Sequence, residues 1–434
     1  MPQRQNPVVV VPGIPGSTLE DAYPLPPEEL WTALLNREYE RLALHSDDPR
    51  YEASEPALVR AGHLFVLGYS AWLRSLRHDL TERADRPTPV FPFPYDWRQD
   101  VAATARQLAA FVAEALDRTA LLRHYGGADG LRVDLVAHSL GGLVIAEYLT
   151  AAGGAARVGK VATLGTPFRG SVEALVKLLT GMGNLAGPRP EEREREAARS
   201  MPAMYQLLPS YAGCLEDEAG SAPPRGLFDV AAWQPGVLAS LEETIRLRAV
   251  DPGNPESRPL RARELLAGYL ELAWGHRQRI ERLRLERAGL APADWLCVVG
   301  VGERTRQAAR LTMVRGQPRY VLSDDDYVDD WRSDPASAVT GDGTVPLAGA
   351  APAFLPRSAL VAVAERDFGF WELRDRGIEA LVGLHALLPS MALAQRLVLR
   401  HLRPSYRGRV SGRPVPGVTP EAWRPPIPGL ALAE

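Results

Sequence analysis

Short, continuous apolar runs alternate with segments of helical periodicity along most of the chain. The runs are rich in β-branched residues and do not alternate with polar residues, a pattern typical of strands buried on both faces of a parallel sheet. They lie at Pro7–Val11, Val90–Tyr95, Leu131–Ala137, Val158–Leu164, Trp295–Val301 and Leu360–Ala364. Between the runs, Val101–Tyr125 and Gly141–Ala152 place apolar residues at helical spacing. Strand, helix and strand in this order predict a doubly wound α/β sheet.

The stretch from Phe168 to Ala293 interrupts this rhythm. It holds an amphipathic segment, Val172–Leu185, and a long helix-like segment, Arg263–Ala288, and no strand pattern is evident in it. We interpret residues 168–293 as a mainly helical cap inserted into the sheet domain.

The cap divides the sheet domain into residues 1–167 and 294–402. A large domain with one insertion also suits a chain of 434 residues, which is long for one ordinary compact core. Residues 403–434 are rich in proline and glycine, and they predict an extended or disordered tail.

Composition and charge exclude several classes of protein. The chain is 46% hydrophobic and 24% charged, as is usual for a soluble globular protein. Its net charge of −3 and the lack of a basic run argue against a nucleic-acid partner. The first residues lack the features of a signal peptide, and no apolar segment is long enough to cross a bilayer, so we expect a cytoplasmic protein. Two cysteines are too few for a disulfide framework.

One serine lies in the sequence context of an activated nucleophile. The run Leu131–Ala137 leads directly into His-Ser-Leu-Gly-Gly, with the serine at position 139, and a helical pattern follows. A G-x-S-x-G elbow needs small residues two positions before and after the serine, because the strand and helix backbones approach each other there. Ala137 and Gly141 occupy these positions. We predict that Ser139 is a nucleophile, in preference to a plain turn without chemistry.

A nucleophilic serine needs a base and a carboxylate that orients the base. In this fold they follow the serine in the order acid, then histidine. Asp342 lies between two glycines, in a tight turn that can direct its side chain into a cleft. His385 follows a short apolar run and precedes a helix-like segment, in a loop from which a base can reach the serine. We predict Asp342 as the acid and His385 as the base.

Other histidines and aspartates are less suited to these roles. His138 adjoins the serine, but neighbours at a sharp turn point in different directions, so we expect it to pack. His276 lies inside the predicted cap, and His401 is typical of a C-terminal helix cap. Six crowded aspartates favour a solvated, mutually repelling loop over a cation site. They are Asp324, Asp325, Asp326, Asp329, Asp330 and Asp334.

The first apolar run ends in a turn of glycine and proline at residues 12–17. Such a turn can present a backbone N–H to a tetrahedral oxyanion, together with the N–H of the residue after the nucleophile. Pro12 and Pro15 have no N–H, so we predict that Ile14 and Leu140 supply the two donors. A plain turn after the first strand is the alternative.

With these motifs in order, the chain resembles the lecithin:cholesterol acyltransferase family of α/β-hydrolases. The Pro-Tyr-Asp-Trp-Arg block is the most diagnostic, because the serine elbow occurs across the whole superfamily. The blocks that carry the resemblance are Val11-Pro12-Gly13, Pro94-Tyr95-Asp96-Trp97-Arg98, Ala137-His138-Ser139-Leu140-Gly141-Gly142, Gly341-Asp342-Gly343-Thr344-Val345-Pro346 and a late His385.

The resemblance implies acyl transfer from a lipid ester to the serine, and from there to water or an alcohol. Ser139, Asp342 and His385 match the triad of the family, and the backbone of Ile14 and Leu140 matches its oxyanion hole. Members of the family also carry a cap and a membrane-contacting segment. Its counterpart in this chain would be Tyr23–Leu44, which contains Leu30, Trp31, Leu34 and Leu35.

Three functions are compatible with these motifs. The leading hypothesis is an ester hydrolase of the lipase or phospholipase type, with a lipid-like substrate and transient contact with a membrane surface. An acyltransferase that delivers the acyl group to an alcohol is the second. A non-catalytic binding protein on a hydrolase scaffold is the third, and the intact set of serine, acid and histidine argues against it. No motif indicates a cofactor or a metal ion.

Overall fold

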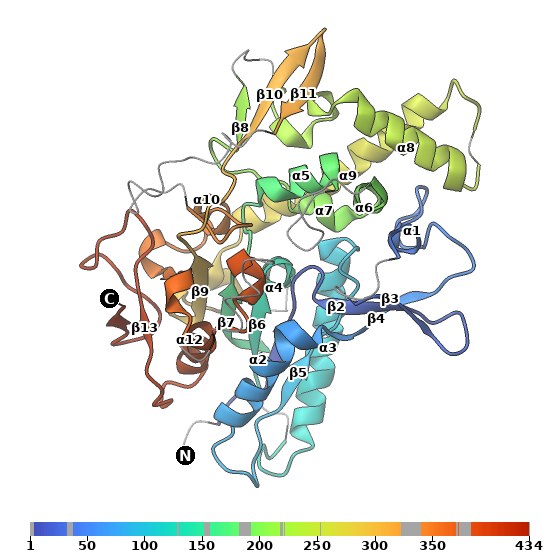
Figure 1. Ribbon diagram of the computed structural model, residues 1–434. Helices are drawn as coiled ribbons and strands as arrows, with labels where there is room; N and C mark the ends of the chain where they lie inside the picture. The colour runs from blue at the N-terminus through green and yellow to red at the C-terminus, as the bar shows by residue number, and fades with distance from the viewer. Residues whose placement is uncertain are drawn as a thin grey trace.

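Six parallel strands form the central sheet, in the order β12-β9-β7-β6-β1-β5 (Figure 1). They are β1 (Val8–Val11), β5 (Val90–Pro92), β6 (Val133–His138), β7 (Val158–Leu164), β9 (Trp295–Gly300) and β12 (Val361–Val363). The computed structural model describes residues 4–433 except 33–37, 128–129, 152–156, 182–191, 218–219, 221, 252, 323–339, 370–371 and 373–382. Each predicted apolar run contains one strand of this sheet, which confirms the α/β class.

Burial on both faces explains the continuous apolar runs. All four valines of β1 are fully buried, but Val8 and Val10 belong to one apolar cluster while Val9 and Val11 belong to the other. Because side chains alternate across a strand, the two clusters lie on opposite faces of the sheet.

Helices cover both faces of the sheet. Apolar residues of α2 and α12 share the cluster of Val8 and Val10, and those of α3 and α4 share the cluster of Val9 and Val11. The bounds of these helices are α2 (Val66–Asp79), α3 (Val101–Ala120), α4 (Leu140–Thr150) and α12 (Ala392–Leu402). The predicted helices Val101–Tyr125 and Gly141–Ala152 thus correspond to α3 and α4, which end earlier than expected.

The segment expected to form a cap is largely helical and includes one short strand. Its elements are α5 (Val172–Thr180), α6 (Glu192–Arg199), α7 (Pro202–Gln206), β8 (Leu215–Asp217), α8 (Pro235–Arg248) and α9 (Arg258–Glu281). Strand β8 pairs with β10 (Ala309–Val314), which forms a hairpin with β11 (Gln317–Val321). The hairpin follows β9 in the chain and joins the capping elements at the top of Figure 1. The sequence pattern had not predicted β8, because three residues are too few to show a period.

The apolar residues of α5 point into the protein. Leu175 and Leu178 are fully buried in the same cluster as Val9, so this part of the predicted amphipathic segment packs against the protein and does not face lipid. The same segment was expected to continue through Met182 and Leu185, which lie outside the described residues.

A small antiparallel sheet near the N-terminus was not predicted. Its order is β3-β2-β4, from β3 (Glu28–Trp31), β2 (Ser17–Asp21) and β4 (Val59–Leu64). Leu30 and Trp31 are buried, and Trp31 packs edge-on against Trp97 with ring centroids 5.6 Å apart. These two residues are therefore core residues, and the expectation that they contact a membrane was wrong; Leu34 and Leu35 lie outside the described residues. Among the helices that the structure describes, none has the length and apolar character needed to cross a bilayer.

The C-terminal tail is extended but packed, which corrects the expectation of a possible disordered end. Val415, Trp423 and Ile427 are buried, and the indole N–H of Trp423 donates to the carbonyl of Leu360 at 2.8 Å. These widely spaced apolar side chains fix the tail to the edge of the sheet at β12. Two short strands, β13 (Ser411–Gly412) and β14 (Ala431–Leu432), pair within it.

The remaining described elements are short. They are α1 (Tyr39–Leu42), α10 (Leu347–Ala350) and the 3₁₀ turns Gly226–Phe228, Val230–Ala232, Leu285–Ala288, Pro292–Asp294, Arg357–Ala359 and Glu365–Asp367. Both cysteines, Cys214 and Cys297, are buried free thiols, and Cys297 lies in β9 as a core residue.

A buried carboxylate in β6 makes the stability of the fold depend on pH. Asp134 accepts hydrogen bonds from the side chain of Asn6 at 2.8 Å and from the amide of Lys160 at 2.9 Å. Burial raises the pKa of Asp134 from 3.8 to about 6, and the two hydrogen bonds oppose this rise only in part. Because the pKa is higher in the folded than in the unfolded chain, the contribution of Asp134 to stability is complete below about pH 4 and is lost as the pH rises through about 6.

We therefore expect the stability of Asp134→Asn to depend less on pH than that of wild type. Asparagine keeps an oxygen for the donors of Asn6 and Lys160 and has no charge to desolvate. As the pH rises from about 4 to about 8, the free energy of unfolding of the variant should increase by about 3 kcal/mol relative to that of wild type. Urea unfolding across this range measures the difference. A difference that stays constant with pH would show that Asp134 is ionised equally readily in the folded and unfolded chains.

Candidate active site

Ser139 lies at the sharp turn between β6 and α4. Its φ is +52°, a value that few non-glycine residues adopt and that often marks a functional turn. The amide of Ser139 donates to the carbonyl of Leu164 at the end of β7, at 2.9 Å, which fixes the turn to the sheet. A β-carbon at Gly141 would collide with the carbonyl oxygens of Val11 and Pro12, so the first turn of α4 requires glycine there. This is the strand, turn and helix that the elbow motif predicts.

The structure brings Ser139, His385 and Asp342 into one hydrogen-bonded series. The Oγ of Ser139 lies 2.9 Å from Nε2 of His385, and Nδ1 of His385 lies 2.7 Å from Oδ2 of Asp342. The amide of His385 also donates to the carbonyl of Asp342 at 3.0 Å. Residues that are 246 and 43 positions apart in the chain thus form two consecutive side-chain contacts.

The other histidines considered as bases lie elsewhere. Nδ1 of His276 is 2.7 Å from a carboxylate oxygen of Glu147, and Nε2 of His401 is 3.2 Å from the carbonyl of Asp294. The six competing aspartates fall within residues 323–339, outside the described residues. The imidazole of His385 is held by Asp342.

Asp342 is oriented by its own turn. The side chain is buried, and its Oδ1 accepts the amides of Thr344 at 3.1 Å and Val345 at 2.7 Å. Oδ2 is left for His385, whose Nδ1–H must donate because the ionised carboxylate can only accept. Nε2 of the neutral imidazole is then unprotonated and accepts the hydroxyl hydrogen of Ser139. This is the tautomer that a general base requires.

The turn at residues 12–17 lies directly beside the serine. A β-carbon on Gly13 would stand only 2.7 Å from Cβ of Ser139. The amide of Gly13 donates to the hydroxyl of Tyr69 at 2.9 Å and so is already engaged. Leu140 is the first residue of α4, so its N–H has no acceptor within the helix. Ile14 and Leu140 therefore keep their place as the proposed oxyanion donors.

The Pro-Tyr-Asp-Trp-Arg block supports this turn. The hydroxyl of Tyr95 donates to the carbonyl of Pro12 at 2.8 Å, and the amide of Tyr95 donates to the hydroxyl of Ser17 at 3.1 Å. The indole N–H of Trp97 donates to the carbonyl of Ser17 at 3.0 Å. In the sequence, this block indicated only a family resemblance. In the structure, it holds both ends of the turn.

Arg98, the last residue of the block, is fully buried. It forms ion pairs with Asp96 at 2.7 Å and Glu52 at 3.0 Å, and it donates to the carbonyl of Leu42 at 3.1 Å. Burial of a guanidinium is tolerated because carboxylates and a carbonyl replace its water. Arg98 thereby joins the N-terminal antiparallel sheet region to the strand end that carries Tyr95.

Two residues near the serine were missed or undervalued. His138 was expected only to pack, but its ring contacts the hydroxyl of Tyr69 at 2.8 Å and the carbonyl of His385 at 2.9 Å. Tyr69 carries no sequence signal, because it lies on the apolar face of an ordinary amphipathic helix. The position of His138 next to Ser139 was the only indication in the sequence.

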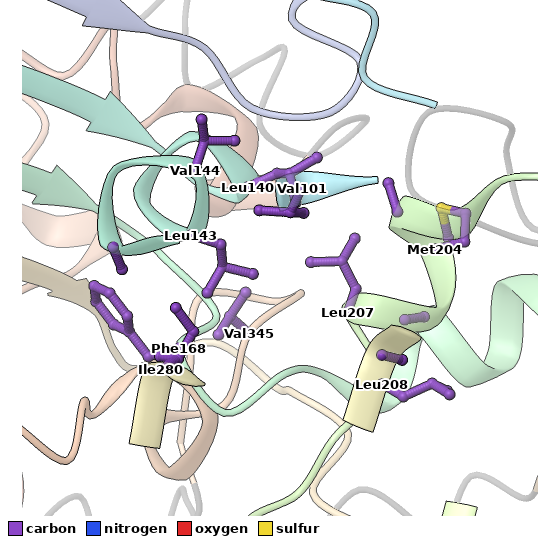
Figure 2. Close-up of a cluster of buried hydrophobic side chains, with 14 of the residues drawn as sticks. Val101, Leu140, Leu143, Val144, Phe168, Met204, Leu207, Leu208, Ile280 and Val345 are labelled. Atoms are coloured by element: carbon purple, nitrogen blue, oxygen red, sulfur yellow. The ribbon is translucent and has the colours of Figure 1, made fainter. Parts of the chain in front are cut away.

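The surroundings of α4, the helix that follows Ser139, are apolar. Figure 2 shows Leu140 and Leu143 of α4 in one buried cluster with Val345, which lies three residues after Asp342, and with Leu207, which follows α7 in the capping segment. The cluster also includes Phe168 and Met204. Apolar side chains from the sheet domain and the capping segment thus pack together around α4.

One family of known proteins matches part of the chain. Residues 68–228 match the family described as "Lecithin:cholesterol acyltransferase". This segment contains Ser139 and the Pro-Tyr-Asp-Trp-Arg block, whereas Asp342 and His385 lie beyond it. No curated protein matches the chain.

Among solved structures, the chain is similar to one in "The crystal structure of Tle4-Tli4 complex". The TM-score is 0.62 at 15% sequence identity, and the match covers 93% of this chain and 99% of the other. At this identity the likeness concerns the fold, and it extends over nearly all of both chains. The parallel sheet, its flanking helices and the elbow confirm the predicted α/β-hydrolase fold class with an inserted, mainly helical segment. The resemblance to the lecithin:cholesterol acyltransferase family, which the ordered motifs predicted, is confirmed by the match over residues 68–228.

Proposed function

We propose that the protein is a serine-dependent hydrolase of carboxylic esters with lipid-like acyl groups, and that it acts through an acyl-enzyme on Ser139. The hydrogen-bonded series of Ser139, His385 and Asp342 carries this proposal. A buried carboxylate, an oriented imidazole and a strained serine turn together constitute an activated nucleophile.

Acylation of the serine follows from these contacts. Oγ of Ser139 attacks the ester carbonyl carbon while its proton passes to Nε2 of His385. The carbonyl oxygen becomes an oxyanion and accepts hydrogen bonds from the amides of Ile14 and Leu140. When the intermediate collapses, the bond from carbon to the alkoxy oxygen breaks, and the proton on His385 goes to the leaving alcohol. The acyl group remains as an ester on Ser139.

Deacylation repeats these steps with water. His385 takes a proton from water, the resulting hydroxide attacks the acyl carbon, and the second tetrahedral intermediate releases the carboxylic acid. The returning proton restores the hydroxyl of Ser139. Asp342 stays ionised throughout and stabilises the imidazolium that forms in each half of the reaction.

A lipid-like acyl group is proposed on the ground of the family match. The family that matches residues 68–228 is described by a lipid ester and an acyl transfer. Contact with a membrane surface during the reaction belongs to the same proposal, without the contribution of Leu30 and Trp31.

The same family description favours a second candidate, transfer of the acyl group to an alcohol. The chemistry differs only in the nucleophile of the second half-reaction. An alcohol in place of water yields a new ester, with the proton again passing through His385.

A panel of substrates tests the proposal and separates the two candidates. Wild type and Ser139→Ala are incubated with p-nitrophenyl esters of short and long acyl chains and with phospholipid vesicles, with and without a primary alcohol. Mass spectrometry identifies the products. Free fatty acid made by wild type alone supports the hydrolase, and a new alkyl ester at the expense of fatty acid supports the acyltransferase. Folded wild-type protein that turns over none of these esters would favour a non-catalytic binding protein.

A further inference from the structure

A chain of hydrogen bonds connects the turn at residues 12–17 with the short helical segment 383–387, which carries His385. The amide of Gly13 lies 2.9 Å from the hydroxyl of Tyr69, which lies 2.8 Å from Nδ1 of His138. Nε2 of His138 lies 2.9 Å from the carbonyl of His385. The chain thus begins one residue before the proposed oxyanion donor Ile14 and ends on the backbone of the proposed base.

Only one arrangement of hydrogens satisfies all three contacts. The amide of Gly13 can only donate, so the hydroxyl oxygen of Tyr69 accepts from it. The carbonyl of His385 can only accept, so His138 carries its proton on Nε2. In a neutral ring Nδ1 is then an acceptor, and the hydroxyl of Tyr69 donates to it. Every member is satisfied, and none has a free choice of direction.

The buried, neutral ring of His138 maintains this arrangement of hydrogens. Its ring is buried between those of Tyr69 and His385, with centroids 6.0 and 5.1 Å away. Burial, and secondarily the nearby His385, lower the pKa of His138 to about 3, so the ring stays neutral in ordinary buffers. A second ring proton would face the hydroxyl of Tyr69 and break the order of donors.

The chain spans the serine from one side to the other. Gly13 approaches Ser139 so closely that a β-carbon would be 2.7 Å from Cβ of the serine, and His385 contacts Oγ of Ser139. A shift of either segment would change the distance from Ser139 to the proposed oxyanion donors or to the proposed base. Such displacements reduce the rate of the chemical step more than they reduce binding.

We propose that Tyr69 and His138 are positioning residues that fix the oxyanion turn and the segment carrying His385 at one separation around Ser139. This inference rests on the proposed function of Ser139 and His385. It assigns no contact with substrate to either residue, since each acts through the backbone of a neighbour.

Removal of the tyrosine hydroxyl is the first test. Tyr69→Phe leaves the amide of Gly13 and Nδ1 of His138 without a partner, and we expect kcat for a short soluble ester to fall about tenfold with little change in KM. Tyr125→Phe is the matched control. Like the hydroxyl of Tyr69, that of Tyr125 is hydrogen-bonded, but it donates to the backbone carbonyl of Gln5 at 2.9 Å, before β1 begins and at the opposite end of the strand from Gly13. The control should keep the wild-type kcat.

A double-mutant cycle tests whether the two residues act as one unit. His138→Gln keeps an amide donor for the carbonyl of His385, and His138→Leu removes it, so the glutamine variant should keep more activity. If Tyr69 and His138 are coupled, Tyr69→Phe together with His138→Leu loses less kcat than the product of the two single losses. Losses that multiply fully, or a Tyr69→Phe variant with the wild-type kcat, would overturn the proposal.

Histidine-selective ¹⁵N NMR provides a readout that does not need turnover. Wild type should show His138 as the neutral tautomer with its proton on Nε2. Tyr69→Phe should shift the ring resonances of both His138 and His385, and Tyr125→Phe should leave them unchanged. A proton on Nδ1 of His138, or a His385 ring that does not respond to Tyr69→Phe, would overturn the inference. A wild type with these signatures but no ester turnover would instead contradict the proposed function alone.

Discussion

Replacement of Ser139 with alanine is expected to lower kcat for ester hydrolysis by about a million-fold. The change removes the only atom that forms the bond to the acyl carbon in the proposed mechanism. The oxyanion amides are backbone groups and remain, so a small rate above that of the uncatalysed reaction should persist. The hydroxyl of Ser139 contacts His385, and alanine fits the same space, so the folded structure should be kept. Initial rates with a p-nitrophenyl ester and thermal unfolding by circular dichroism measure the two quantities.

Ser75→Ala is the matched control for this loss. Ser75 lies in α2 and donates its hydroxyl to Asp79 at 3.0 Å, within its own helix. It should keep the wild-type rate. Ser139→Ala with a rate near that of Ser75→Ala would show that another group is the nucleophile.

Asp342→Asn is expected to lower kcat by about ten-thousand-fold with little effect on the fold. The amides of Thr344 and Val345 hold Oδ1 of the wild-type carboxylate, so the oxygen of asparagine should take that place. The NH₂ group then replaces Oδ2 and faces Nδ1 of His385. A donor at this point requires Nδ1 to accept, which moves the ring proton to Nε2. The imidazole can then no longer accept the proton of Ser139.

The tautomer of His385 checks this reasoning independently of the rate. Histidine ¹⁵N NMR should show the ring proton on Nδ1 in wild type and on Nε2 in Asp342→Asn. A variant with the wild-type rate, or with an unchanged tautomer, would mean that Asp342 does not orient the base.

The central sheet could be predicted because burial on both faces leaves a local signature. The valines of β1 need no alternation with polar residues, since each face is covered by helices. The elbow was equally local, because strand, serine, glycine and helix are contiguous in the chain. Asp342 and His385 were predicted by chain order and by the glycines around Asp342. The distances from Ser139 to His385 and from His385 to Asp342 could not be predicted, since these residues lie far apart in the chain and meet only in the folded protein.

Other features were missed because they depend on distant partners. Strand β8 is three residues long and exists through its pairing with β10, which begins 92 positions after the last residue of β8. Leu30 and Trp31 formed an apolar pattern that suits a membrane as well as a protein core, and partners distant in the chain such as Trp97 bury them in the core. The tail after α12 contains few apolar residues, but three of them are buried. Tyr69 is a positioning residue through a partner 69 positions away.

Covalent labelling with a fluorophosphonate tests the nucleophile most directly. A serine activated by His385 and Asp342 attacks phosphorus as it attacks an ester carbon, and fluoride leaves. Peptide mass spectrometry of the folded wild-type protein should place the adduct on the peptide that contains Ser139. The adduct should be absent from Ser139→Ala and from heat-denatured wild type. No adduct on the folded protein, or labelling that persists in Ser139→Ala, would contradict the assignment of Ser139 as the nucleophile.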